Sequence, residues 1–173
     1  DFSGNDESAL IDAFGAGGDD VALSIDLASD GGFAVAGFSR ATSTSDSDGY
    51  VLRTDSDANV DWETLLGGEQ DDLVNGILVA TGDAVVVTGY SESFGDGDRD
   101  GYFAKLEPDT GDISWQRQFG GENDENLYGV AEEPVGGGYV LAGLTQSYGD
   151  AVPKVLLVGT DADGQIGYLM PAK

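Results

Sequence analysis

Residues 67–72, with the sequence Gly-Gly-Glu-Gln-Asp-Asp, recur 53 residues later at 120–125 as Gly-Gly-Glu-Asn-Asp-Glu. A degenerate copy lies 52 residues before the first of these, beginning at Gly15 and carrying Asp19 and Asp20. Repetition at a fixed period of this length is typical of proteins built from stacked supersecondary units. We therefore expect the recurring residues to serve the architecture before any chemistry.

Each copy continues with four short apolar runs separated by turns rich in Gly, Asp and Ser. The runs lie at 21–27, 32–37, 50–53 and around Trp62; at 73–79, 84–89, 102–105 and around Trp115; and at 127–131, 138–143, 155–158 and around Tyr168. Runs rich in Val, Leu, Ile and aromatic residues predict strands, and no window shows the period of an amphipathic helix. The pattern predicts an all-β chain with four antiparallel strands per copy.

Four strands in a repeated unit of about 50 residues are typical of a β-propeller blade. The sequence predicts one domain with an N-terminal strand at 9–14 and blades at 15–66, 67–119 and 120–173. The N-terminal strand corresponds to the last strand of a preceding blade. The paired glycines are interpreted as tight turns, since neither Lys-Ser/Thr nor a helix follows them as in a phosphate-binding loop.

Residues 107–115 carry an acid, then Thr110-Gly111 and, after three further residues, Trp115. This order resembles the tryptophan-docking motif of quinoprotein-type propellers, and 55–62 and 161–168 resemble shortened versions. The whole unit is also similar to the repeats of secreted bacterial and archaeal propellers, with kelch propellers as a looser relative. The resemblance implies that the tryptophans lie between neighbouring blades. It implies little about activity, because such repeats occur in enzymes, assembly factors and adhesive surface proteins.

The chain has 173 residues, with 33 acidic and 7 basic side chains, a net charge of −26 and 40% hydrophobic residues. The acids gather in turns and leave the apolar runs intact, which indicates a folded protein and not a disordered acidic tail. At molar salt the Debye length falls to about 3 Å, so repulsion among surface carboxylates is screened. The composition favours an extracellular or cell-surface protein of a halophilic archaeon; a very acidic secreted protein of a mesophile is the alternative.

The same composition excludes several classes of function. A strongly negative surface repels nucleic acid, and no apolar run is long enough to predict a transmembrane segment. The chain contains neither His nor Cys, which removes Ser-His-Asp triads, thiol nucleophiles and zinc–thiolate sites. We therefore expect a non-enzymatic protein without a cofactor. A slice of a quinoprotein-like oxidoreductase is an alternative, although none of that family's cofactor ligands is identified.

The sharpest local motif consists of Asp96, Asp98 and Asp100, followed by Glu107. These acids match positions 1, 3, 5 and 12 of the EF-hand calcium loop. The flanks differ, because the residues between Asp100 and Glu107 are predicted as a strand and Pro108 follows. Calcium binding by Asp96, Asp98 and Asp100 alone, similar to the calcium loops of integrin α-subunit propellers, is a candidate site; a solvated acidic turn is the alternative.

Three blades do not close a ring, since closed propellers carry about 4–8. An open arc would leave two apolar sheet faces in water. We expect a homo-oligomer, either a six-bladed ring of two chains or a head-to-tail filament, with strand 9–14 of one chain added to another. The alternatives are docking of a surface protein, a calcium- or glycan-binding module, a piece of a longer propeller and an open arc that is stable on its own. Tyr128, Tyr139 and Tyr148 are candidates for a sugar-binding rim, although Tyr139 fits packing within the sheet better.

Overall fold

The computed structural model describes residues 13–15, 18–42, 45–95, 99–134, 136–148 and 152–169. Within these ranges the chain forms twelve β-strands and no helix, which confirms the all-β prediction. The strands are β1 (Asp19–Leu27), β2 (Phe33–Arg40), β3 (Asp48–Thr54) and β4 (Val60–Leu66); β5 (Asp72–Val79), β6 (Val85–Ser91), β7 (Asp100–Leu106) and β8 (Ile113–Phe119); and β9 (Glu125–Glu132), β10 (Tyr139–Thr145), β11 (Lys154–Thr160) and β12 (Ile166–Leu169).

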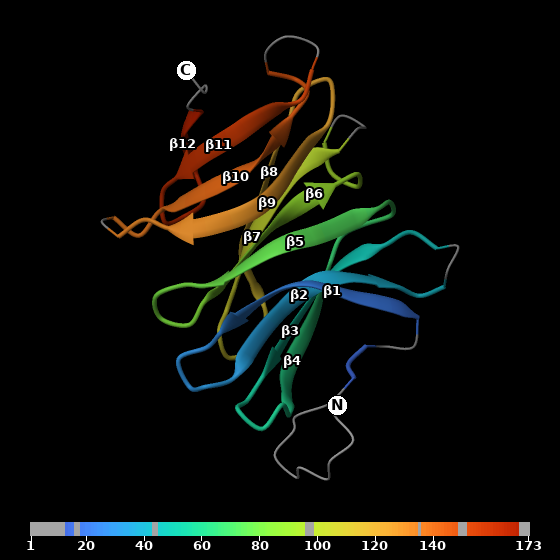
Figure 1. The fold of residues 1–173 in the computed structure, drawn as a ribbon, viewed down its shortest axis with the longest axis vertical. Helices are drawn as coiled ribbons and strands as arrows, with labels where there is room; N and C mark the ends of the chain where they lie inside the picture. Colours follow the sequence, from blue (N-terminus) through green and yellow to red (C-terminus); the bar gives the residue numbers. More distant parts are fainter. Residues whose placement is uncertain are drawn as a thin grey trace, which may run out of the picture.

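The strands form three four-stranded antiparallel sheets, each made of consecutive strands (Figure 1). We name them sheet 1 (β1–β4), sheet 2 (β5–β8) and sheet 3 (β9–β12). Their first strands begin at Asp19, Asp72 and Glu125, so the sheets follow the sequence repeat. The prediction of four antiparallel strands per copy is confirmed.

The register of hydrogen bonding between the first and second strands is the same in all three sheets. In each sheet the first strand bulges near its middle, where Ala22, Val74 and Leu127 pair with the glycines of the second strand. A Cβ on Gly89, for example, would lie 1.7 Å from the carbonyl oxygen of Leu73. The glycine that ends each second apolar run is therefore required by the close approach of the bulged strand.

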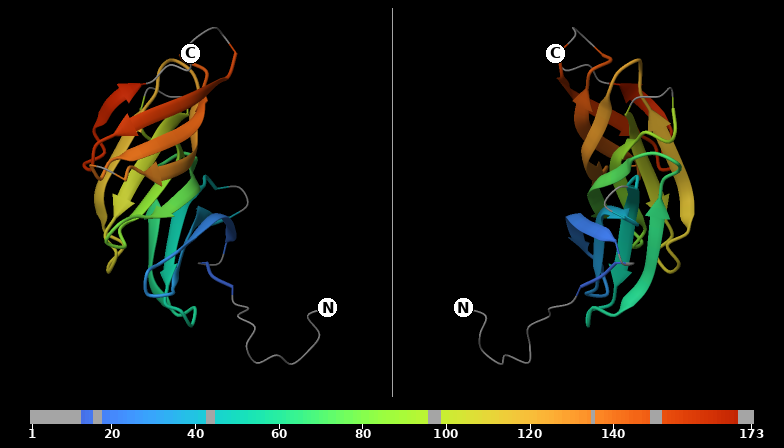
Figure 2. Two further views of the ribbon diagram at one scale, coloured as in Figure 1. Left: turned by 60° about the vertical axis from the view of Figure 1, so that its left-hand side comes forward. Right: turned by 90° about the vertical axis from the view of Figure 1, so that its right-hand side faces the viewer.

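The three sheets are stacked one after another, with sheet 2 in the middle (Figures 1 and 2). The first strand of each sheet packs across the first three strands of the sheet before it, β5 on β1–β3 and β9 on β5–β7. The stack formed by the described residues is open at both ends. None of the helices that a membrane span would require occurs in the described part of the chain.

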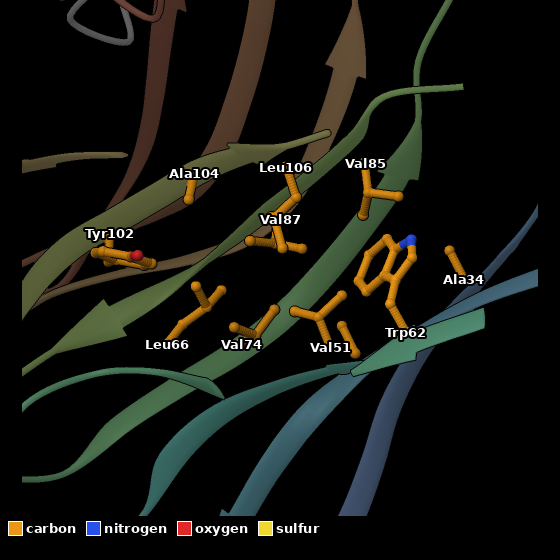
Figure 3. Close-up of a cluster of buried hydrophobic side chains, with 11 residues drawn as sticks. Ala34, Val51, Trp62, Leu66, Val74, Val85, Val87, Tyr102, Ala104 and Leu106 are labelled. Atoms are coloured by element: carbon orange, nitrogen blue, oxygen red, sulfur yellow. The ribbon is translucent and has the colours of Figure 1, made fainter. Parts of the chain in front are cut away.

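Two hydrophobic cores hold the stack together. Core 1, between sheets 1 and 2, contains Ala34, Ala36, Val51, Trp62 and Leu66 together with Val74, Val85, Val87, Tyr102, Ala104 and Leu106 (Figure 3). Core 2, between sheets 2 and 3, contains Ala80, Val86 and Phe103 together with Leu127, Tyr139, Leu141, Leu156 and Val158. Sheet 2 is thus covered on both faces, which explains the unbroken valine run of β6.

The predicted N-terminal strand at 9–14 is not seen as a strand in the part that is described. Residues 9–12 lie outside the described residues, and 13–15 are not in a strand. Phe14 nevertheless lies at the outer side of sheet 1, where it lines a cavity together with Val35, Tyr50 and Leu52. Strand donation by residues 9–14 stays a prediction.

Candidate functional site

Trp62 joins sheet 1 to sheet 2. Its side chain lies in core 1, and its Nε1 donates a hydrogen bond of 2.9 Å to the carbonyl oxygen of Pro108. Beside it, Oγ1 of Thr64 donates a hydrogen bond of 2.8 Å to the carbonyl oxygen of Gly111. The turn that receives Trp62 belongs to the docking motif of the next repeat. The expectation that this tryptophan lies between neighbouring units is confirmed.

The receiving turn requires glycine. Gly111 has a φ of +71°, and a Cβ there would lie 2.5 Å from Cε3 of Trp62. The arrangement recurs at the next junction, where Gly164 has the same φ of +71° and a Cβ would lie 2.8 Å from the ring of Trp115. Each tryptophan therefore docks on the glycine turn of the following repeat.

Sheet 1 carries a variant of this turn. Ala58 has a φ of 62° and donates its backbone N–H to the carbonyl oxygen of Asp55, as Gly164 does to Asp161. Both tryptophans of the chain dock elsewhere. The turn of sheet 1 is thus left without a tryptophan partner among the described residues.

Buried carboxylates tie the glycine-rich junctions. Glu125, fully buried, accepts hydrogen bonds from the backbone N–H of Gly121 (2.7 Å), from Oγ1 of Thr145 (2.6 Å) and from both N–H and Oγ of Ser147 (3.1 Å each). Asp72 occupies the equivalent position and accepts from the N–H of Gly68. The recurring acid after each glycine pair is therefore architectural, as the repeat predicts.

Asp72 is less well compensated than Glu125. Its Oδ2 accepts hydrogen bonds from Gly68 and from Oγ of Ser93, whereas its buried Oδ1 has no hydrogen-bond partner among the described residues. Asp48 lies close by, since a Cβ on Gly67 would come within 2.5 Å of an Asp48 oxygen and 2.6 Å of an Asp72 oxygen. Burial, followed by the charges of Asp72 and Asp46, raises the pKa of Asp48 above its usual value.

This raised pKa predicts the effect of Asp48→Asn. A folded state that binds the proton more tightly than the unfolded state loses stability as pH rises through the interval above the ordinary aspartate pKa. Removing the charge should therefore raise the melting temperature at neutral pH in dilute salt, by roughly 1–3 °C, and should change little at pH values where Asp48 is protonated. Thermal unfolding followed by circular dichroism tests this. Asp109→Asn, in an exposed turn, is the control; an equal shift in both variants would contradict the prediction.

Sheet 3 leaves an apolar face in water, which we name face 3. On β10 it contains Val140, Ala142 and Leu144, which pair with Gly159, Leu157 and Val155 of β11. Leu157 is 42% exposed, whereas the residues at the same register position of the other sheets, Val51 and Phe103, are 0% exposed. None of the six residues of face 3 is charged, although the chain carries 33 acids.

Sheet 1 has an apolar face at the other end of the stack, which we name face 1. It contains Ala22, Ile25, Leu27, Phe33 and Val35 together with Tyr50 and Leu52, and these last two are only 9% and 1% exposed. Ile25 is 64% exposed, whereas its equivalents Ile77 and Val130 pack against cores 1 and 2. At the Tyr50 end of face 1, Phe14 and Asp20 line a cavity of about 220 Å³.

The candidate calcium loop is only partly within the described residues. Asp96 and Asp98 lie outside them, and Asp100 begins β7 with 6% exposure. β7 carries Glu107 away from Asp100 to the far end of the strand, where its carboxylate accepts a hydrogen bond of 2.6 Å from Oγ of Ser114. The described residues contain no group of three acids arranged around a metal position. Calcium binding by Asp96, Asp98 and Asp100 stays a prediction.

The three tyrosines of the suggested sugar-binding rim have different environments. Tyr139 is 2% exposed and belongs to core 2, so it does not reach the surface. Tyr128 and Tyr148 are exposed, and the hydroxyl of Tyr148 donates a hydrogen bond of 2.9 Å to the carbonyl oxygen of Gly120. The interpretation that Tyr139 packs within the sheet is confirmed, and a sugar-binding rim that includes it is wrong.

Sequence reasoning missed two ion pairs that a buried arginine of sheet 1 makes with more exposed carboxylates. Arg53 is 8% exposed, and its two terminal nitrogens lie 2.9 Å from Asp30 and 2.9 Å from Asp61. A hydrogen bond from the backbone N–H of Gly32 and the guanidinium of Arg53 lower the pKa of Asp30. The only signal was an arginine inside a strand, opposite Trp62 in the register.

No family model matches the chain, and no curated protein matches it.

Proposed function

We propose that this chain is a non-enzymatic extracellular scaffold of the β-propeller type, which associates with copies of itself through face 1 and face 3 in high salt. The observation that carries the proposal is the exposure of Leu157 at 42%, at a position where Val51 and Phe103 are 0% exposed. An uncharged apolar sheet face on so acidic a protein is typical of an interaction surface.

The propeller assignment is supported by the way the repeats contact one another. Each repeat forms a four-stranded meander, and the first strands β1, β5 and β9 lie next to one another in sequence order. Side chains of neighbouring first strands also bond directly, as in the hydrogen bond of 2.7 Å from Nδ2 of Asn75 to Oδ1 of Asn126. Adjacent first strands and tryptophans that dock on the next repeat are features expected of four-stranded blades around an axis, and they support the propeller assignment.

A structural role also accounts for a cavity of about 450 Å³ that is lined by Thr81, Glu132 and Pro134. Oε2 of Glu132 accepts hydrogen bonds of 2.9 Å from both the N–H and Oγ1 of Thr81. This carboxylate therefore fastens sheet 3 to sheet 2. With its acceptor oxygen occupied in this way, it serves the junction between repeats.

The net charge of −26 makes the association of copies depend on salt. Copies of so acidic a chain repel one another in dilute buffer, whereas molar salt screens the repulsion and strengthens the burial of apolar faces when the anion is excluded from the surface. We therefore expect association to increase with salt concentration.

Sedimentation velocity in dilute and molar KCl tests the proposal. The wild type should be larger than one copy in molar KCl and should shift toward single copies in dilute buffer. Leu157→Glu should stay a single copy in molar KCl, because the contact would bury its charge. Ile113→Glu is a matched control, since Ile113 is 43% exposed but belongs to the middle sheet. A wild type that remains a single copy at every salt concentration would exclude self-association.

A further inference from the structure

We infer that the contact between copies is directional: face 3 of one copy covers face 1 of the next. This inference rests on the proposed self-association and specifies which surface is the partner of which. A second copy of the chain would therefore cover each outer face, in the same kind of contact that joins neighbouring sheets within one chain.

The two internal interfaces are built from the same two halves. The preceding sheet contributes the residues at the positions of Val51 in sheet 1 and Phe103 in sheet 2. The following sheet contributes those at the positions of Val87 in sheet 2 and Leu141 in sheet 3. We call the surface contributed by the preceding sheet the preceding half of a junction, and the surface contributed by the following sheet its following half. Both junctions join one half of each kind.

The outer faces are the two halves that remain. Face 3 has the register of a preceding half, because Leu157 pairs with Ala142 as Val51 pairs with Ala36. Face 1 has the register of a following half, because Ile25 pairs with Val35 as Ile77 pairs with Val87. Contact of face 3 with itself would join two preceding halves, an arrangement that neither internal junction uses. A heterologous contact continues the established interface at both ends.

Residue types at the docking position agree with this pairing. Each tryptophan docks on a turn that has glycine, Gly111 or Gly164. The strand register places Tyr168 opposite Gly159, the position that the tryptophans hold in the other two sheets. Among the described residues, the one remaining turn of this type lies in sheet 1 and has Ala58. Pairing sheet 3 with sheet 1 therefore matches the smaller aromatic residue type with the turn that has the additional methyl group.

Two variants that each damage one face test the direction of the contact. Ile25→Glu places a charge on face 1, and Leu157→Glu places one on face 3. Each variant alone should associate roughly a hundredfold more weakly than the wild type in molar KCl, because every contact would bury an unpaired charge. An equimolar mixture should regain a two-copy species, since the intact face 3 of Ile25→Glu covers the intact face 1 of Leu157→Glu. Sedimentation velocity with one variant fluorescently labelled detects this mixed species.

Other results would overturn the inference. If Ile25→Glu associated as well as the wild type while Leu157→Glu did not, face 3 would pair with itself; self-association would survive and the directional contact would fail. A mixture that stays dissociated would also exclude the complementary pairing. If the wild type never associated, the proposed function would fail as well. Ile25→Ser and Leu157→Ser are milder substitutions for use if a glutamate variant does not fold, as judged by circular dichroism.

Discussion

Gly111→Ala is expected to lower the free energy of unfolding by about 2–4 kcal/mol. Two costs add at this position. The φ of +71° is unfavourable for any residue with a Cβ, and the new methyl group would lie 2.5 Å from Cε3 of Trp62. Because Trp62 is 7% exposed and docked on the turn, the ring has little room to move. Urea unfolding in molar KCl, followed by tryptophan fluorescence, measures the change.

Gly82→Ala is the matched control for this prediction. Gly82 has a φ of +82°, yet a Cβ there would meet no atom within 4 Å. It should therefore show the backbone cost alone, about 1–2 kcal/mol. Equal losses in the two variants would mean that docking of Trp62 on the turn does not contribute to stability. Ala58→Gly, in the turn without a tryptophan, should be close to neutral or stabilising.

Glu125→Ala is expected to cost about 3–5 kcal/mol. Glu125 is 0% exposed and accepts hydrogen bonds from Gly121, Thr145 and Ser147. The substitution would remove the acceptor of the Gly121 N–H and of Thr145 Oγ1, whereas Ser147 keeps the Oγ1 of Thr145 and the carbonyl oxygen of Asn123 as acceptors. Glu125→Gln keeps one acceptor oxygen and should lose roughly half as much. The same urea titration measures both variants.

Glu122→Ala is the control for the second prediction, because Glu122 is exposed in the same turn and has the same charge. Its effect should stay within about 0.5 kcal/mol. If Glu125→Ala changed stability no more than Glu122→Ala did, the buried carboxylate would not hold the junction. The repeated acid would then need an explanation other than architecture.

The strands could be predicted from the sequence because their signal is local. Apolar runs and glycine turns recur at the same offsets, and each run is long enough to identify a strand by composition. The partner of a tryptophan could not be predicted from its motif alone. Residues 107–115 contain Trp115, yet the turn they form receives Trp62 of the preceding repeat, a contact that only the stacking of sheets creates.

The sequence also does not distinguish a covered sheet face from an exposed one. Leu157 and Val51 lie in similar apolar runs, and only the end of the stack leaves Leu157 exposed. One difference between the repeats does point to sheet 1 as an end of the stack: Ala58 stands in its turn where the other two repeats have Gly111 and Gly164. The burial of Arg53 could not be predicted from its position in β3. The two carboxylates that balance its charge come from elsewhere in the sequence, Asp30 from the loop after β1 and Asp61 from β4.

Register-equivalent core residues differ in volume, and this difference limits how the repeats can be rearranged. Sheet 1 contributes Ala34 and Val51 to core 1, whereas sheet 2 contributes the larger Val86 and Phe103 to core 2. Each junction is filled by a particular pair of neighbours, to the density of a protein interior. The repeats are consequently not interchangeable parts: a chain with its units shuffled would combine bulky with bulky surfaces at one junction and leave voids at the other.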